Sequence, residues 1–144
     1  MNGVQSMSKG KARARRSVPT KKDLESLSNF RYVLRRFLRY SEDVTQSAGI
    51  TPLQYLLLLH VQGIAGRSWA SVGELAERLQ AAPNGTAALV SRCERAGLVI
   101  RKPGEQDRRQ VEVHLTPAGE RCLLKLANLH LNEIKSFRWI LAEI

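Results

Sequence analysis

The stretch Leu75–Val99 has the sequence LAERLQAAPNGTAALVSRCERAGLV, and Asp107–Glu120 follows after a short loop with the sequence DRRQVEVHLTPAGE. The first stretch carries two short runs of helical apolar spacing, one on either side of Ala81-Ala82-Pro83. The second alternates apolar and polar residues over Val111–Leu115, as a half-buried strand does. This pattern predicts two short helices, a tight turn between them, and a β-hairpin after the second helix.

Capping residues set the limits of the two short helices. Ser71 and Glu74 have the spacing of a capping box and begin the first of them, which is predicted to end near Leu79-Gln80. Asn84 is the predicted N-cap of the second, which ends at Gly97 because glycine tolerates the left-handed conformation found there. The inward side of this second helix is predicted to consist of Leu89, Val90 and Cys93.

The hairpin is predicted from a change of period after the second short helix. Leu98–Lys102 and Val111–Leu115 are the predicted strands. The polar loop Pro103–Gln110 joins them, and its charged tip carries Asp107, Arg108 and Arg109. Asp107 has three interpretations: it pairs with Arg109, it binds the backbone of the loop, or it is an ordinary turn aspartate.

Longer helices are predicted on both sides of this region. An apolar stripe from about Asp23 to Gln46 predicts a long first helix. Thr51, with proline next and glutamine three residues on, begins a second helix that is apolar on nearly all sides and ends at Gly63. Thr116-Pro117 begins a last helix that runs toward the C-terminus. Its predicted apolar row is Ile134, Phe137, Leu141 and Ile144.

Charge is spread unevenly along the 144 residues, whose formal net charge is +10. Residues 1–22 hold seven Lys or Arg residues and no acid, whereas the basic and acidic residues of 23–144 nearly balance. Blocks of like charge are typically disordered and often bind polyanions. We therefore expect residues 1–22 to form a basic, disordered tail that either contacts nucleic acid or is simply solvated.

Several classes of protein and site are disfavoured by the sequence. No apolar segment follows the basic stretch as in a secretory signal, and no apolar run approaches the roughly 20 residues of a membrane span. The two cysteines, Cys93 and Cys122, have no metal-type spacing and fit a reducing cytoplasm. We see no phosphate-binding glycine loop and no nucleophile–base pair, so we expect neither enzymatic activity, nor a cofactor, nor a metal site.

Two short helices, a turn and a basic hairpin have the organisation of a winged helix-turn-helix. The major groove of DNA accepts one helix, whose N-terminal side chains meet the base edges. The hairpin reaches the neighbouring minor groove, where arginine is favoured by the negative potential. The predicted fold is therefore mainly α with a small β-hairpin wing, and the predicted partner is double-stranded DNA.

The two quoted stretches resemble the MarR family of bacterial winged-helix regulators. The resemblance covers roughly residues 25–144 and is strongest in the wing, at Asp107, Arg109, Leu115, Thr116 and Gly119. It implies a homodimer held by the first and last helices, a pseudo-palindromic operator, and often a small-molecule effector. It divides residues 23–144 into dimerisation helices, 23–50 and 117–144, and a winged helix-turn-helix, 51–116.

The resemblance also implies sites. The expected DNA-binding residues are Pro83, Asn84, Gly85, Thr86, Ala87, Ala88, Ser91, Arg92, Asp107, Arg108 and Arg109. Arg92 and Arg95 have an alternative role as surface partners of Glu94. The expected effector-binding residues, which are equally consistent with plain core, are Phe37, Tyr40, Tyr55 and His60.

Two features depart from the family pattern. Ala87-Ala88 stand midway along the recognition helix, where many members have a polar or basic residue. The usual sixth helix is not distinguishable before Ile144. The function expected is a dimeric, sequence-specific repressor released from its operator by a small-molecule effector, for which aromatic compounds are the candidate class. The alternative is a nonspecific or architectural nucleic-acid-binding protein that relies on the basic tail and the wing.

Overall fold

The structure is a computed structural model that describes residues 17–142. Its elements are α1 (Lys21–Ser47), α2 (Pro52–Gln62), β1 (Trp69–Ser71), α3 (Val72–Leu79), α4 (Pro83–Arg95), β2 (Val99–Pro103), β3 (Val111–Leu115) and α5 (Pro117–Ala142). The predicted fold class, mainly helical with a small β wing, is confirmed. The predicted tail lies outside the described residues over 1–16.

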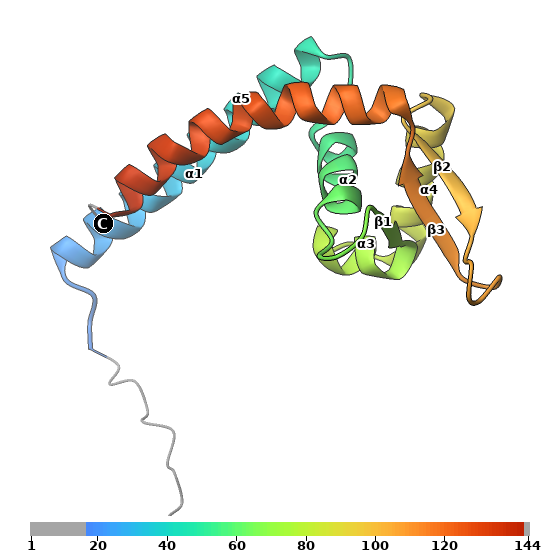
Figure 1. The fold of residues 1–144 in the computed structure, drawn as a ribbon. Helices are drawn as coiled ribbons and strands as arrows, with labels where there is room; N and C mark the ends of the chain where they lie inside the picture. The colour runs from blue at the N-terminus through green and yellow to red at the C-terminus, as the bar shows by residue number, and fades with distance from the viewer. Residues whose placement is uncertain (1–16, 143–144) are drawn as a thin grey trace, which may run out of the picture.

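The molecule consists of a long two-helix arm and a small lobe (Figure 1). Helices α1 and α5 lie antiparallel, side by side, and form the arm; each has the length of roughly 40 Å that 26 or 27 helical residues give. The lobe contains α2, α3, α4 and the sheet, and the β2–β3 hairpin projects from it. Within residues 17–142, no helix has an apolar stretch long enough to cross a lipid bilayer.

Three helices begin at capping boxes. The boxes predicted at Thr51 and Ser71 are both confirmed. Helix α1 begins two residues before the predicted Asp23, because Thr20 and Asp23 form a third box: the Thr20 amide donates to Asp23 Oδ2 at 2.8 Å. Hydrogen bonds from Thr20 hold the pKa of Asp23 below its ordinary value. The last two residues assigned to the tail, Lys21 and Lys22, are therefore helical.

The sheet has one strand more than the predicted hairpin. Its order is β1-β3-β2, and both pairings are antiparallel. The unpredicted strand, Trp69–Ser71, pairs with β3 through Trp69 opposite His114 and Ser71 opposite Glu112. It extends the hairpin toward α3, so that the wing and the helix-turn-helix share one core.

That core is formed by apolar side chains from every element of the lobe and from the first half of α5. Its largest fully buried apolar side chains are Leu57, Leu58, Val61, Leu75, Val90, Cys93, Val99, Val113 and Leu126. The predicted inward residues of α4, Leu89, Val90 and Cys93, are all buried. Burial raises the pKa of the Cys93 thiol to about 11, so at neutral pH it is protonated and behaves as a small apolar residue.

The junction between α5 and β2 explains the Leu-Thr-x-x-Gly pattern. Thr116 accepts a hydrogen bond from the Gly119 amide at 3.0 Å and donates through the same hydroxyl to the carbonyl of Gly97 at 2.6 Å. Its own amide donates to the Leu98 carbonyl. At Gly119 the backbones of α5 and β2 approach so closely that a Cβ atom would overlap the Leu98 carbonyl oxygen. The junction therefore needs a hydroxyl side chain at position 116 and glycine at position 119.

Candidate nucleic-acid interface

Helix α3 is anchored at its start by a charged network. The Glu74 carboxylate accepts a hydrogen bond from the Ser71 amide and pairs with Arg67, whose guanidinium also lies 4.0 Å from the ring centre of Trp69. Burial raises the pKa of Glu74, but the hydrogen bonds from Ser71 and the charge of Arg67 outweigh this and leave it below its ordinary value. The helix ends at Gln80, which adopts the left-handed conformation at φ 51°. The conformation of Gln80 therefore sets the direction in which the chain leaves α3 and enters the turn.

Helix α4 begins one residue before the predicted cap. Pro83 is its first residue, Ala82 is the N-cap, and no side chain caps the helix. The prediction that Asn84 caps the helix is wrong, because proline suits the first helical turn and places Asn84 inside it. As a result the Asn84 side chain is exposed at the positive, N-terminal end of the helix.

The exposed side of α4 carries most of the predicted contact residues. Asn84, Gly85, Ala88 and Arg92 are exposed, together with Pro83 at the helix start. Thr86 is only 1% exposed and donates to the Ala82 carbonyl at 3.0 Å, so its assignment to the DNA-facing side is wrong. Its side chain is buried, and its hydroxyl is hydrogen-bonded to the preceding turn.

Ala87 and Ser91 are partly buried and are covered by a residue that the sequence analysis missed. Arg101, on β2, donates to the Ala87 carbonyl at 3.1 Å and to the Ser91 hydroxyl at 3.0 Å. Glu94 pairs with Arg101 at 3.3 Å rather than with Arg92 or Arg95. Strand alternation in the sequence already places Arg101 on the same side of β2 as Val99. Its role could not be predicted from this alone, because its hydrogen-bond partners lie on α4.

The wing tip is a closed loop held by its backbone. The Gly104 amide donates to the Gln110 carbonyl at 2.7 Å, and the Gln110 amide donates to the Asp107 carbonyl at 3.0 Å. Asp107 Oδ1 accepts the Arg109 amide at 3.0 Å, which matches the interpretation that Asp107 binds the loop backbone. A Cβ atom at Gly104 would overlap the Asp107 carbonyl oxygen, so glycine is required there.

The two wing arginines face solvent. Arg108 and Arg109 are exposed, and no salt bridge among residues 17–142 involves either of them. The aspartate therefore shapes the backbone below Arg109 without neutralising its guanidinium. The wing presents two free positive charges on a fixed loop.

Three of the four predicted effector residues come together, around a residue that was not predicted. Phe37, Tyr40 and Tyr55 surround His130, whose ring stacks on Tyr55 at 4.4 Å. The fourth, His60, lies apart: burial and the charge of Arg78 lower its pKa, and no aromatic contact among the described residues joins it to this cluster. The cluster lies where α1, α2 and α5 meet.

His130 is buried and fully hydrogen-bonded. Its Nδ1 lies 2.8 Å from the Leu126 carbonyl and its Nε2 lies 2.9 Å from the Ser41 hydroxyl. Because a carbonyl only accepts, Nδ1 carries a proton. The ring ties α1 to α5 and, through Tyr55, both of them to α2.

Comparison with known proteins identifies this architecture. Residues 48–110 match the sequence profile of the MarR family. The winged-helix part of this chain is therefore similar to the MarR family over these residues. Among solved structures, AbsC of Streptomyces coelicolor, a MarR family transcriptional regulator, has a TM-score of 0.71 at 23% identity, covering 83% of this chain and 80% of that one.

Two further similar proteins are informative. A MepR variant of S. aureus, solved bound to an oligodeoxyribonucleotide, has a TM-score of 0.63 at 19% identity, covering 79% of this chain and 80% of its own. A protein of Thauera aromatica, whose name assigns it to transcriptional regulation of the hcr operon, is 27% identical over 101 residues. That match covers 70% of this chain and 59% of the relative's length.

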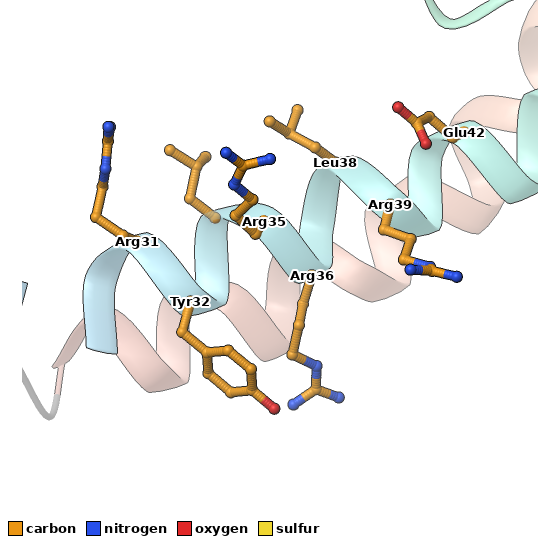
Figure 2. Close-up of a pocket in the computed structure, with 8 residues that line it drawn as sticks. Arg31, Tyr32, Arg35, Arg36, Leu38, Arg39 and Glu42 are labelled. Atoms are coloured by element: carbon orange, nitrogen blue, oxygen red, sulfur yellow. The ribbon is translucent and has the colours of Figure 1, made fainter. Parts of the chain in front are cut away.

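Outside its winged helix, the chain has a basic arm. Figure 2 shows the arginines of α1 projecting outward around a shallow groove, with Arg36 5.7 Å from the ring centre of Tyr32. The lining of the groove comes from α1 alone: Arg31, Tyr32, Leu34, Arg35, Arg36, Leu38, Arg39 and Glu42. Within the described residues, no group of His, Cys, Asp and Glu side chains is arranged to hold a metal ion.

Proposed function

We propose that this protein is a dimeric, sequence-specific DNA-binding regulator, and that it acts as a repressor. The proposal rests on one observation: two exposed surfaces, one on α4 and one on the wing, lie on the same lobe. Helix α4 presents Asn84, Ala88 and Arg92 at and beyond its positive end, and the wing presents Arg108 and Arg109. A helix of this kind fits the major groove, and basic side chains at a hairpin tip fit the adjacent minor groove. The DNA-bound MepR neighbour has the same fold.

The decisive experiment selects bound sequences from a random pool of duplex DNA. A regulator is expected to enrich one site and to bind it at least about 10³-fold more tightly than random DNA. In a two-fold dimer, the half-site centres should lie about one helical turn apart. Equal affinity for all sequences would instead favour the nonspecific, architectural alternative.

Arg109→Ala is expected to weaken binding to the selected site by about 1–3 kcal/mol while leaving the unfolding midpoint nearly unchanged. The side chain is exposed, and its removal leaves the hydrogen bond between its amide and Asp107 intact. Fluorescence anisotropy at fixed salt measures the loss. Arg36→Ala, which removes the same charge from the arm, is the control and should bind normally. Unchanged affinity in Arg109→Ala would contradict the assignment of the wing.

Dimerisation is supported by exposed apolar stripes on both helices of the arm. On α1 the residues spaced alternately by three and four are Leu24, Leu27, Arg31, Leu34 and Leu38. On α5 they are Leu124, Ala127, Leu131, Ile134 and Arg138. Leu27 is 59% exposed and Leu131 is 57% exposed. Apolar stripes of this spacing are typical of helices that pack against partner helices, and a second copy of the arm would cover them.

The proposal includes a small aromatic or phenolic anion as the effector, bound beside the cluster of Phe37, Tyr40, Tyr55 and His130. This cluster joins the arm to the lobe, so a ligand that binds better to one arrangement of the two shifts the DNA affinity by that difference. His130 supplies two ring nitrogens among the aromatic rings of the cluster, and in this structure they are hydrogen-bonded to the Leu126 carbonyl and the Ser41 hydroxyl. It fills the centre of the cluster in this structure, so its ring must move for a ligand to enter.

Thermal-shift screening with substituted benzoates, followed by release of the selected DNA, tests the effector. A compound that binds is expected to raise the thermal unfolding midpoint of the wild type and to lower its affinity for the selected DNA. His130→Phe retains a ring of similar size but lacks the nitrogens, and it should lose the response while still binding DNA. A hit that acts equally on His130→Phe, or the absence of any hit, would remove this cluster from the proposal.

A further inference from the structure

Arg101 lies between the two parts of the proposed DNA-binding surface. It stands in the middle of β2, opposite Val113 on β3, and its side chain points to the same side of the sheet as Val99. Its side chain is 30% exposed. The neighbouring Lys102, on the opposite side of the strand, is exposed. Arg101 is thus a charged side chain on the inward side of the wing.

Its contacts extend along two turns of α4. One guanidinium nitrogen donates to the Ala87 carbonyl at 3.1 Å and to the Ser91 hydroxyl at 3.0 Å, and the other lies 3.3 Å from Glu94 Oε1. The second carboxylate oxygen of Glu94 accepts the Arg101 backbone amide at 3.2 Å. Ala87, Ser91 and Glu94 are spaced by four and three residues, so they share one side of the helix.

This set of contacts requires an arginine. The guanidinium is planar and presents five donors in a fixed fork, so it reaches a carbonyl, a hydroxyl and a carboxylate at once. Lysine carries the same charge on a single nitrogen and cannot span the three acceptors. Beyond Arg101, strand β2 contains only Lys102 and Pro103, and both are exposed. Arg101 is therefore the last residue of β2 whose side chain is partly buried.

We propose that Arg101 is a positioning residue that fixes the angle between the wing and helix α4, so that both engage one DNA duplex together. The inference rests on the proposed function. The same guanidinium that holds α4 is not free to contact DNA, since its outward charge is already paired with Glu94. Loss of the contact should leave the lobe folded, because the core beneath it is apolar and complete. The wing should then move independently of the helix.

The first test uses the free protein. In Arg101→Met and Arg101→Lys, backbone amides of the outer hairpin, around residues 102–111, should exchange with solvent faster than in the wild type. Lys102→Met removes a charge from the neighbouring exposed position and should leave the exchange unchanged. Unaltered exchange in both Arg101 variants would overturn the inference, whether or not the protein binds DNA.

The second test uses the selected DNA site and a double-mutant cycle. Arg101→Met should lower the specific affinity about tenfold, the value of one charge-assisted hydrogen bond, while its affinity for random DNA falls no more than that of Lys102→Met. Arg109→Ala should cost much less in the Arg101→Met background than in the wild type, because a mobile wing is no longer aligned. Additive losses, equal on specific and random DNA, would show a plain phosphate contact and overturn the inference. If the wild type shows no preferred site, the proposed function fails, and the exchange test still decides the role of Arg101.

Discussion

Gly119→Ala is expected to destabilise the protein by about 3 kcal/mol or more, a large fraction of the typical stability of a domain. The added methyl group would overlap the Leu98 carbonyl oxygen, which is backbone and therefore has no rotamer to relieve the clash. Helix α5 would have to shift away from β2 and break the hydrogen bonds of Thr116. Urea denaturation followed by circular dichroism measures the loss as a lower midpoint.

Gly73→Ala is the matched control for this substitution. Gly73 lies in α3 and is exposed, and a Cβ atom at this position would lie 3.9 Å from the Ser71 hydroxyl, which is an ordinary contact. Alanine in a helix is favoured over glycine by about 0.5–1 kcal/mol, so this variant should be as stable as the wild type or more so. Equal urea midpoints for the two alanine variants would show that the α5–β2 junction accommodates the methyl group without a loss of stability.

Leu131→Glu is expected to convert the proposed dimer to a monomer and to weaken binding to the selected site by about 10²–10⁴-fold, since the two half-sites would be engaged separately. A carboxylate buried in an apolar seam has no partner and strongly opposes association. Because Leu131 is 57% exposed in the single chain, the monomer itself should stay folded. Sedimentation at micromolar concentration gives the mass, and anisotropy gives the affinity.

The neighbouring Asn132→Glu adds the same charge on a different side of α5 and should remain dimeric. Phe137, which belonged to the predicted interface row, is a poorer choice because it is half-buried against Phe37 within the arm, with ring centres 5.7 Å apart. Of the same row, the Leu141 side chain and Ile144 lie outside what the structure describes. A wild-type chain that sediments as a monomer would contradict the dimer directly.

The parts of the fold that depend on local chemistry could be predicted from the sequence. The capping boxes at Thr51 and Ser71 need only residues three positions apart. The alternation of Val111–Leu115 located strand β3 but not its two sides, because Val111 is exposed and Glu112 is buried. The cap at Asn84 was wrong because two local preferences competed, and the preference of Pro83 for the first helical turn prevailed.

Features that depend on distant partners were missed. Strand β1 has three residues and is a strand only through its pairing with β3, more than 40 residues later. Arg101 becomes recognisable once α4 lies beside β2, and His130 once α1 and α2 pack on α5. Thr86 was expected on the DNA-facing side of α4 from the resemblance, whereas its hydroxyl donates to the preceding turn and its side chain is buried.

A single residue, Thr116, separates the end of β3 from the start of α5, which continues without interruption to the tip of the arm. Strand β3 of the wing and helix α5 of the arm therefore form one continuous unit. The hydrogen bonds of Thr116 and the close packing at Gly119 hold this unit together at its base. A tilt of 5° about the base displaces the far end of a helix of roughly 40 Å by about 3.5 Å, close to one base-pair rise. In the proposed dimer, the crossing angle of the two α5 helices thus determines the distance between the two wings.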